Sequence, residues 1–275
     1  MNTHKSIKPC VSLLLLALAS IAGAHDTWLI EGTGTQEMTS DHREIALALT
    51  TGDAFPAQGT TSSPARILRA SLISADTSVP LLIGNSTAQA LEFRGLTKAK
   101  SVVIAVVQLK PSQIDLPKDK VAGYLEELGN PSGARARYEK SGTWQESYSK
   151  NAKMWVRVGT QAAPKSLLAP MNLPYELVPV RDPTTLKIGE SLKVCAYANG
   201  KAAPKAYIGM VGADGKHVNV WADQKGCASF KLASVSGYLI HGIRLEPSKM
   251  PSLDWESHFA SLTVLDVSKA GIGAQ

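Results

Sequence analysis

The sequence predicts a mainly β protein made of two β-sandwich domains, with a short helical insertion in the first. Short runs rich in Val, Ile and Thr recur along the chain, and Gly, Pro, Asn and Asp separate them. This pattern is typical of strands joined by turns, and many short strands favour a sandwich-like architecture. The length of 275 residues is sufficient for two domains of ordinary size.

The first 24 residues have the organisation of a Sec signal peptide. Lys5 and Lys8 give a positive start, residues 11–21 are apolar, and residues 22–24 form a small-residue A-x-A site. The apolar stretch is shorter than the roughly 20 residues that a spanning helix needs. We therefore expect an exported, periplasmic protein that is cleaved after Ala24 and does not span the membrane after processing.

The charge of the chain is only mildly basic. Its formal net charge is +6, which falls to +4 when Lys5 and Lys8 leave with the leader. One short basic patch comprises Arg135, Arg137 and Lys140, and the other basic residues are scattered. We therefore expect no nucleic-acid partner.

Three segments in the first half are the clearest strand candidates. Residues 44–52 and 65–74 are rich in β-branched and apolar residues and are bounded by turn-forming residues. The third segment, residues 101–109, reads SVVIAVVQL and is apolar at nearly every position. Because no face of this segment is polar, it is expected to be a central strand.

A helical insertion is expected around residues 117–152. Pro117 suits a first helical turn and Gly129 suits a helix end. Between them, four apolar residues share one helical face: Val121, Tyr124, Leu125 and Leu128. A second helix is expected in the segment TWQESYSKNAK, before MWVRVG returns to a strand, because three of its residues share a side: Trp144, Tyr148 and Ala152.

A domain boundary is expected near residue 165, giving an N-terminal domain over 25–165 and a C-terminal domain over 166–275. The segment GTQAAPKSLLAPMNLP is rich in Ala and Pro and has no strong hydrophobic period. After it, Asn199-Gly200 and Asp214-Gly215 each separate two apolar runs, which predicts antiparallel hairpins.

The mature chain would keep two cysteines, Cys195 and Cys227. An even pair in an oxidising compartment favours a disulfide over a metal site. Such a bond would close a loop of about 30 residues and contribute roughly 3 to 4 kcal/mol in the chain-entropy model. Two reduced, buried thiols are the alternative.

Five segments, in order, carry a resemblance to a known family. They read AHDTWL, ALTTGDAFPAQ, ESYSKNAKMWVRVG, YELVPVRDPTTLKIGESLKVCAYANGKAAPKA and DWESHFASLTVLDV. Together they resemble the domain-of-unknown-function 4198 family over nearly the whole mature chain. The resemblance implies a periplasmic β-sandwich protein with an immunoglobulin-like C-terminal half, related to nickel or cobalt uptake components. A metal-transport membrane component is therefore an expected partner.

His25 is the first candidate metal ligand. Cleavage after Ala24 would make it the N-terminal residue, and its free amine and imidazole Nδ1 could then close a chelate ring on one metal ion. Amine and imidazole nitrogens suit Cu²⁺ and Ni²⁺, and Cu²⁺ binds more tightly in the usual affinity order. One chelating residue is a partial site, so further ligands are needed.

His241 and His258 are the expected partners of His25. They lie in two apolar runs joined by a loop that contains Pro247 and Pro251, which predicts a hairpin. If the hairpin is symmetric about residues 249 and 250, the two histidines are opposite each other, with Cβ atoms about 4.5 to 5.5 Å apart. The alternative is that each is a core histidine bonded to a carbonyl or a carboxylate.

The remaining polar residues are weaker candidates. His217 lies beside a turn and is expected to be exposed, whereas His42 could approach the N-terminus if the first two strands pair. Asp26 could orient the His25 imidazole or supply an oxygen ligand. The sequence has no nucleophile elbow, zinc-protease pair, phosphate-binding loop or dinucleotide fingerprint, so we expect no catalytic residues.

Three functions are compatible with these residues. The first is a periplasmic protein that binds nickel, cobalt or copper for uptake or handling, through His25, His241 and His258. The second is a copper-dependent redox enzyme that uses the same nitrogens. The third is a metal-free scaffold module that binds a protein or a glycan. The first is the function that we expect.

Overall fold

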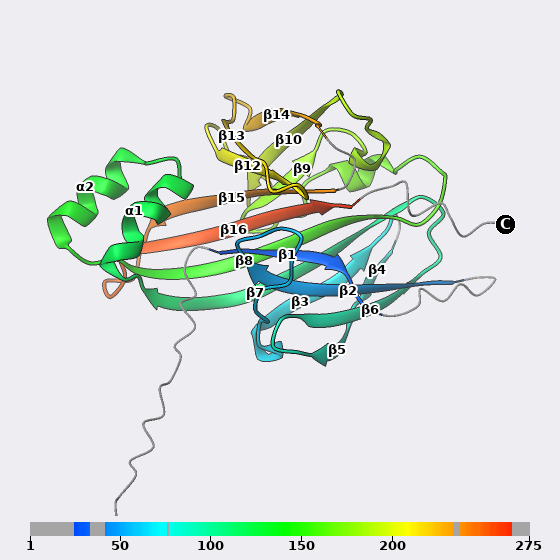
Figure 1. The fold of residues 1–275 in the computed structure, drawn as a ribbon, viewed down its shortest axis with the longest axis horizontal. Helices are drawn as coiled ribbons and strands as arrows, with labels where there is room; N and C mark the ends of the chain where they lie inside the picture. The colour runs from blue at the N-terminus through cyan, green and yellow to red at the C-terminus, as the bar shows by residue number, and fades with distance from the viewer. Residues whose placement is uncertain (1–24, 34–41, 76, 234–236, 266–275) are drawn as a thin grey trace, which may run out of the picture.

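The computed structural model describes residues 25–33, 42–75, 77–233 and 237–265, and it is mainly β (Figure 1). Its strands form three sheets that lie in three layers. The expected signal peptide lies outside the described residues. In the part of the chain that is described, no helix is long and apolar enough to cross a membrane.

The middle layer is an eight-stranded sheet. Its strands, in spatial order, are β13 (His217–Trp221), β12 (Tyr207–Gly212), β15 (Tyr238–Pro247), β16 (Trp255–Val264), β8 (Gln145–Arg157), β7 (Val102–Asp115), β3 (Ile67–Ile73) and β4 (Ser78–Pro80). All neighbours are antiparallel except β16 and β8, which run parallel.

Each outer layer is a smaller antiparallel sheet. One has the strand order β1 (Asp26–Glu31), β2 (Arg43–Gly52), β6 (Leu91–Thr97) and β5 (Leu82–Ser86). The other contains β9 (Glu176–Pro179), β10 (Ser191–Ala198), β11 (Lys201–Ala202) and β14 (Cys227–Lys231). Short 3₁₀ helices cover residues Pro64–Arg66, Lys165–Leu168 and Pro183–Thr185.

The predicted central strand explains the three layers. Residues alternate between the two faces of a strand, and both faces of β7 are buried. Val102, Ile104 and Val106 pack toward the outer sheet that contains β10. Val103 and Val107 pack on the opposite side, toward the sheet that contains β2. The prediction that this segment is central is confirmed.

Strands from both expected domains take part in the middle sheet. The boundary near residue 165 lies between β8 and β9, yet β16 from the C-terminal part pairs along its whole length with β8 from the N-terminal part. The β16 strand satisfies the backbone groups along one edge of β8, while the buried faces of β8 are covered by the outer layers.

The helical insertion is shorter than expected. The first predicted helix is present as α1 (Lys118–Glu127), which buries Val121, Tyr124 and Leu125. A second helix, α2 (Ser132–Ser141), follows it, but the segment predicted to be the second helix is strand β8. Residues four apart share a face in both a helix and a strand, so the spacing of Tyr148 and Ala152 did not distinguish them.

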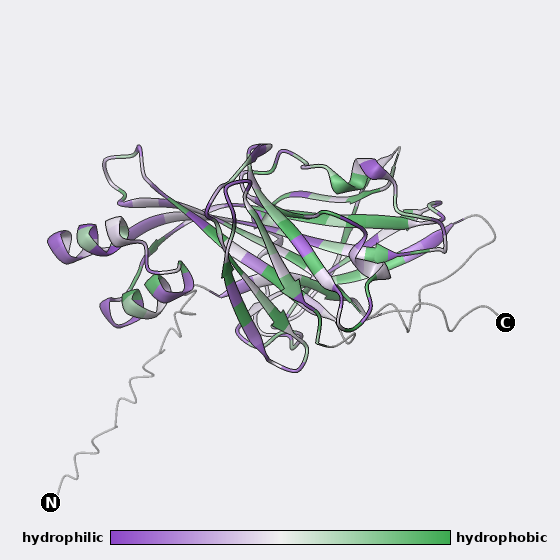
Figure 2. Ribbon diagram, turned by 90° about the horizontal axis from the view of Figure 1, so that it is seen from above, coloured by the Kyte–Doolittle hydropathy of each residue, from purple (hydrophilic) through white to green (hydrophobic). Residues whose placement is uncertain are grey.

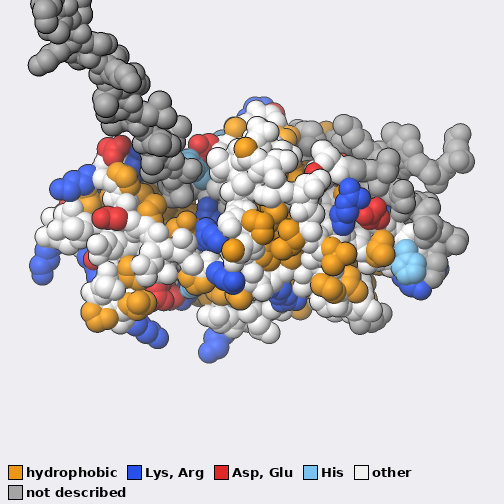
Figure 3. Space-filling model, turned by 90° about the horizontal axis from the view of Figure 1, so that it is seen from below, with side chains coloured by type: hydrophobic (Ala, Val, Ile, Leu, Met, Phe, Trp, Pro, Cys, Tyr) orange, Lys and Arg blue, Asp and Glu red, His pale blue; other side chains and the backbone are white. Residues whose placement is uncertain are grey.

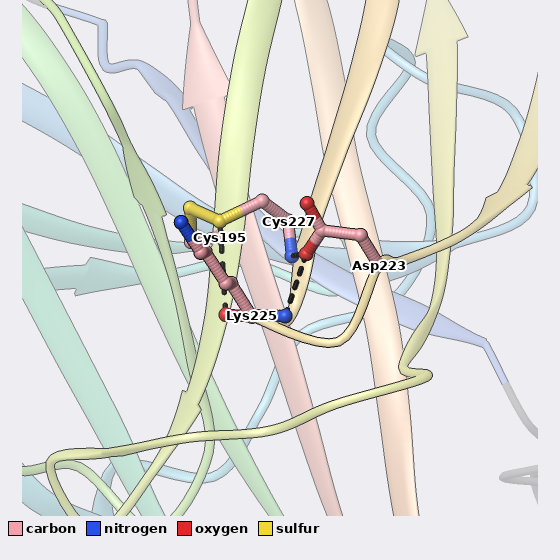
Figure 4. The surroundings of a disulfide bond; sticks show 4 residues. All are labelled: Cys195, Asp223, Lys225 and Cys227. Carbon is pink, nitrogen blue, oxygen red and sulfur yellow. Dashed lines mark hydrogen bonds between the residues drawn. A yellow bond between two sulfur atoms is a disulfide. The ribbon is translucent and has the colours of Figure 1, made fainter.

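The predicted disulfide joins Cys195 of β10 to Cys227 of β14 (Figure 4). The two cysteines are directly paired across the strands, with their Cα atoms 3.9 Å apart. Asp223 accepts hydrogen bonds from the backbone N–H groups of Lys225 (2.8 Å) and Cys227 (2.9 Å), which fixes the turn that enters β14. The bond therefore ties two strands of one outer sheet.

Hydrophobic residues concentrate in the strands, whereas the two helices are largely hydrophilic (Figure 2). The underside of the molecule has apolar side chains in separate groups with polar and charged ones between them (Figure 3). Exposed apolar residues of the outer sheet include Leu82 and Ile83 on β5 and Leu96 on β6. The fold also creates a pocket at the start of β1, beside Asp26.

Candidate metal-binding pocket

A pocket of about 350 Å³ lies between one end of the middle sheet and the strand that begins at Asp26. Strands β13, β12 and β15 form its floor, while β1, the turn after β2 and the end of α1 form its walls. The charged, imidazole and amide side chains among its lining residues are His25, Asp26, Asp53, Glu127, His217, Asn219 and His241.

A glycine makes room for the central histidine of the pocket. Gly209 on β12 pairs with His241 on one side and with Asn219 on the other, so all three residues share a face. A Cβ atom at residue 209 would collide with Nε2 of His241 and lie 2.6 Å from Oδ1 of Asn219. The imidazole therefore occupies the space that any other residue at 209 would fill.

The two ring nitrogens of His241 have different surroundings. Nδ1 lies 2.9 Å from Oδ2 of Asp26. Nε2 is buried and has no hydrogen-bond partner among the described residues. Burial would lower the pKa of His241, but the charge of Asp26 and its hydrogen bond outweigh burial, and the net shift is upward. The Asp26 contact fixes the ring and leaves Nε2 unpaired.

His25 is held by its backbone and its ring. Its carbonyl oxygen accepts a hydrogen bond of 2.7 Å from Nζ of Lys150, a buried residue of β8. Its Nδ1 contacts Oδ1 of Asp53. Burial lowers the pKa of Lys150 to about 8, although the Asp26 carboxylate acts in the opposite direction. Lys150 thus anchors the residue that would begin the mature chain.

A second hydrogen bond holds strand β1 two residues after His25, at Thr27. The hydroxyl of Ser261 on β16 donates a hydrogen bond of 2.6 Å to the carbonyl oxygen of Thr27. Both Ser261 and Thr27 are buried. Together with the Lys150 contact, this bond positions Asp26 against β15.

Glu127, at the end of α1, adds a third carboxyl group to the pocket. Burial, followed by the charges of Asp26 and Asp53, raises the pKa of Glu127 to about 7, while His241 and Lys150 act in the opposite direction. The acidic groups of the pocket favour a cation over an anion.

The predicted pairing of His241 with His258 is wrong. In the β15–β16 hairpin, His241 is opposite Ser261, and His258 is opposite Arg244. Strand β15 ends at Pro247 and β16 begins at Trp255. The observed pairing of the two strands therefore differs from the assumed pairing by an odd number of residues. An odd offset moves a side chain to the other face of the sheet.

His258 therefore lies on the face opposite to the pocket. Its Nδ1 is 2.6 Å from the hydroxyl oxygen of Ser149, its neighbour on β8. Burial lowers the pKa of His258, with Glu246 and Glu256 acting against this effect. His258 thus bonds a hydroxyl group, whereas His241 has the carboxylate partner that the alternative interpretation of a core histidine expects.

Several pocket residues were not recognised in the sequence. His217, which was expected to be exposed beside a turn, is exposed and also lines the pocket. Asp53, Glu127 and Asn219 had no sequence signal beyond the alternation that places 217 and 219 on one side of β13. Asp26, which could have oriented the His25 imidazole or supplied an oxygen ligand, contacts His241 instead.

The pocket brings together two of the three predicted ligands, His25 and His241, as lining residues. Among the described residues, no three His, Cys, Asp or Glu side chains are grouped closely enough to hold a metal ion. The residues nevertheless suit a cation chemically, because imidazole nitrogens and carboxylate oxygens are common metal donors. The fit depends most on the unpaired Nε2 of His241.

Fold and pocket together define a three-layered β protein with a histidine–carboxylate pocket. The chain belongs to the family described as domain of unknown function DUF4198, whose model matches residues 22–241. The match includes both His25 and His241. No curated protein matches the chain.

Proposed function

We propose that this protein is a periplasmic transition-metal-binding protein that holds copper, nickel or cobalt in the pocket for uptake or handling. The observation that supports the proposal most is the buried, unpaired Nε2 of His241, which lines the same pocket as His25. A buried polar atom without a partner is rare in folded proteins and calls for an explanation such as a bound ion.

The ligands are the nitrogens of two residues. Cleavage after Ala24 frees the amine of His25, and this amine and Nδ1 chelate the metal ion. Nε2 of His241 supplies a third nitrogen. An amine with two imidazoles resembles the histidine brace of copper-binding β-sandwich proteins, and nitrogen donors of this kind suit Cu²⁺ and Ni²⁺. His258 has no part in this site.

Asp26 has the supporting role that carboxylates commonly have at metal sites. A histidine that binds a metal through one nitrogen usually donates its other ring N–H to a carboxylate or carbonyl group. The contact between Nδ1 of His241 and Asp26 has this form, and it leaves Nε2 as the ring nitrogen without a partner.

Asp53 is the group that must move when the metal binds. It contacts Nδ1 of His25, the atom that closes the chelate ring. Its side chain is 75% exposed, so it can rotate into solvent with little loss of packing. Once rotated, its carboxylate is also able to ligate the metal or balance its charge.

The test compares protein that begins at His25 with protein carrying one extra residue before His25. Calorimetric titration with Cu²⁺, Ni²⁺ and Co²⁺ is expected to show tight, one-to-one binding of at least one metal to the first protein. The extended protein is expected to bind at least tenfold more weakly, since its amine is blocked. Equal, poor binding of all three metals to both proteins would overturn the proposal.

Two histidine variants locate the site. His241→Ala removes the unpaired nitrogen and is expected to weaken binding at least tenfold. His258→Ala is the matched control, because this histidine lies on the other face of the same hairpin. It is expected to leave affinity unchanged. Equal effects of the two substitutions would place the metal outside this pocket.

A further inference from the structure

We propose that the pocket takes the metal ion as a complex with a small, amino-acid-sized chelator that carries a carboxylate. This inference rests on the proposed function and names the form in which the metal is bound. Two observations carry it, the size of the pocket and a second buried polar atom without a partner, together with the number of protein ligands in the proposed site.

The pocket is larger than a metal ion needs. Its volume of about 350 Å³ falls within the range of small-molecule sites, roughly 300 to 1,000 Å³. A water molecule occupies about 30 Å³ in the liquid, so a metal ion with a few waters would fill only part of this space. Room for a small organic molecule therefore remains beside the ion.

The protein ligands do not complete a coordination sphere. The amine and Nδ1 of His25 and Nε2 of His241 supply three nitrogens. Nickel and copper ions take about four to six ligands, which leaves one to three positions for other donors. An amino acid fills such positions with its amine and its carboxylate, and histidine adds its imidazole.

Trp28 supplies a donor that a metal ion cannot satisfy. This residue lines the pocket, is 1% exposed, and its indole Nε1 has no partner among the described residues. An indole N–H donates a hydrogen bond and cannot ligate a metal. It requires an acceptor, and the carboxylate of a chelator is such a group.

The pocket wall beside Trp28 is apolar. Trp28 packs with Phe55, Val211 and Leu239, which all line the pocket. Such a wall suits the carbon skeleton of an organic ligand better than the water shell of a bare ion. It lies next to the histidines, because His241 follows Leu239 by two residues on the same face of β15.

The negative charge of the pocket makes binding of the chelator depend on the metal ion. The carboxylates of Asp26 and Asp53 lie in the walls, so a carboxylate-bearing ligand alone would meet like charges. A divalent ion that carries one amino-acid anion keeps a net positive charge. The complex is therefore favoured over the free chelator.

The test uses L-histidine as the chelator, because its three donors and the three protein nitrogens together complete six-coordinate Ni²⁺. Radiolabelled L-histidine is dialysed to equilibrium against the protein that begins at His25, with and without one equivalent of Ni²⁺. One histidine per protein is expected to be retained with Ni²⁺, and essentially none without it.

Two tryptophan variants identify the recognising group. Trp28→Phe keeps an aromatic ring but removes the N–H, and is expected to lower histidine retention about tenfold while leaving the affinity for Ni²⁺ alone within twofold. Trp255→Phe is the matched control. Trp255 is also buried with an unpaired Nε1, yet it packs against Trp144 outside the pocket. It is expected to leave retention unchanged.

The outcomes separate this inference from the proposed function. Binding of Ni²⁺ without retained histidine, or removal of Ni²⁺ from the protein by histidine, would overturn the inference and leave the metal site in place. Retention that is equal without Ni²⁺, or unchanged in Trp28→Phe, would also overturn it. Failure of Ni²⁺, Cu²⁺ and Co²⁺ to bind in the calorimetric titration would overturn the proposed function itself.

Discussion

Nδ1 of His241 lies 2.9 Å from Oδ2 of Asp26, and this contact joins the first strand of the described chain to the floor of the pocket. Asp26 directly follows His25, so the carboxylate that orients one histidine is bonded through the backbone to the other. The geometry of the pocket therefore depends on how β1 is seated against β15.

Replacing Asp26 with asparagine tests this relationship. Asp26→Asn removes the charge that holds the His241 ring, and substitutions of such supporting groups lower metal affinity by about ten- to hundredfold. Calorimetric titration with the tightest-binding metal measures the change. Asp119→Asn is the control, because that side chain is 73% exposed on α1. Equal affinities of the two variants would contradict a supporting role for Asp26.

Replacing Gly209 with alanine tests the space beneath His241. The added Cβ would collide with Nε2, so either the ring or β12 must shift. We expect a loss of stability of about 1 to 3 kcal/mol, typical of overpacking, together with weaker metal binding. Urea unfolding and titration measure the two effects.

Gly84→Ala is the matched control for Gly209→Ala. Gly84 also lies in a strand, but a Cβ there would have its nearest neighbour at an ordinary 3.4 Å. It is expected to leave metal binding unchanged. If Gly209→Ala retains full stability and metal affinity, the imidazole of His241 is not packed against residue 209 as the structure shows.

The elements that could be predicted from the sequence are those with a local signal. Strand β7 was recognisable because it is apolar on both faces, and α1 because Pro117 and Gly129 bound its apolar face. The hairpin at Asn199-Gly200 has the positive φ angles, 48° and 74°, that this pair adopts readily. Each of these features depends on residues close together in the chain.

The features that were missed depend on distant residues. The parallel pairing of β8 with β16 joins residues 109 apart, such as Ser149 and His258, and no local pattern encodes it. The hairpin register depended on where the loop is centred, and an odd error reversed the face of His258. Within the pocket, His25 and His241 were predicted. Asp53 follows β2 in a turn and Glu127 ends α1, and only the fold brings these two residues to the pocket.

The buried pair of Lys153 and Glu176 is expected to hold two layers together. Nζ of Lys153 on β8 lies 2.8 Å from Oε2 of Glu176 on β9, and both side chains are nearly fully buried. Glu176 also accepts hydrogen bonds from the backbone N–H groups of Met171 and Leu173. Lys153→Met would leave a buried charge unpaired and is expected to cost about 3 to 5 kcal/mol of unfolding free energy.

Urea unfolding of Lys153→Met measures that loss, and Lys216→Met is its control. Lys216 forms an ion pair of 3.0 Å with Asp214, but its side chain is 78% exposed. Exposed pairs contribute little to stability, so this variant is expected to unfold like the parent protein. A similarly small effect of Lys153→Met would mean that the buried pair does not stabilise the layers.

Glu146 is expected to make stability depend on pH. This buried carboxyl group accepts hydrogen bonds from Tyr124 (2.9 Å), Trp144 (2.7 Å) and the Ser257 hydroxyl. Burial raises the pKa of Glu146 although all three hydrogen bonds act to lower it. The folded protein therefore holds the Glu146 proton more tightly than the unfolded chain does.

The sign of the effect follows from this difference in proton binding. The stabilisation is fully present below the pKa of the unfolded chain and is lost as the pH rises through the higher pKa of the folded protein. Glu146→Gln cannot titrate, so its stability should fall less steeply than that of the parent protein across this range. The free energy of unfolding that Glu146→Gln loses relative to the parent protein should therefore be greatest at acidic pH and should shrink as the pH rises. Urea unfolding at several pH values measures both slopes, with Glu139→Gln on the exposed side of α2 as the control. Parallel curves for Glu146→Gln and the parent protein would show that Glu146 has the same pKa in both states.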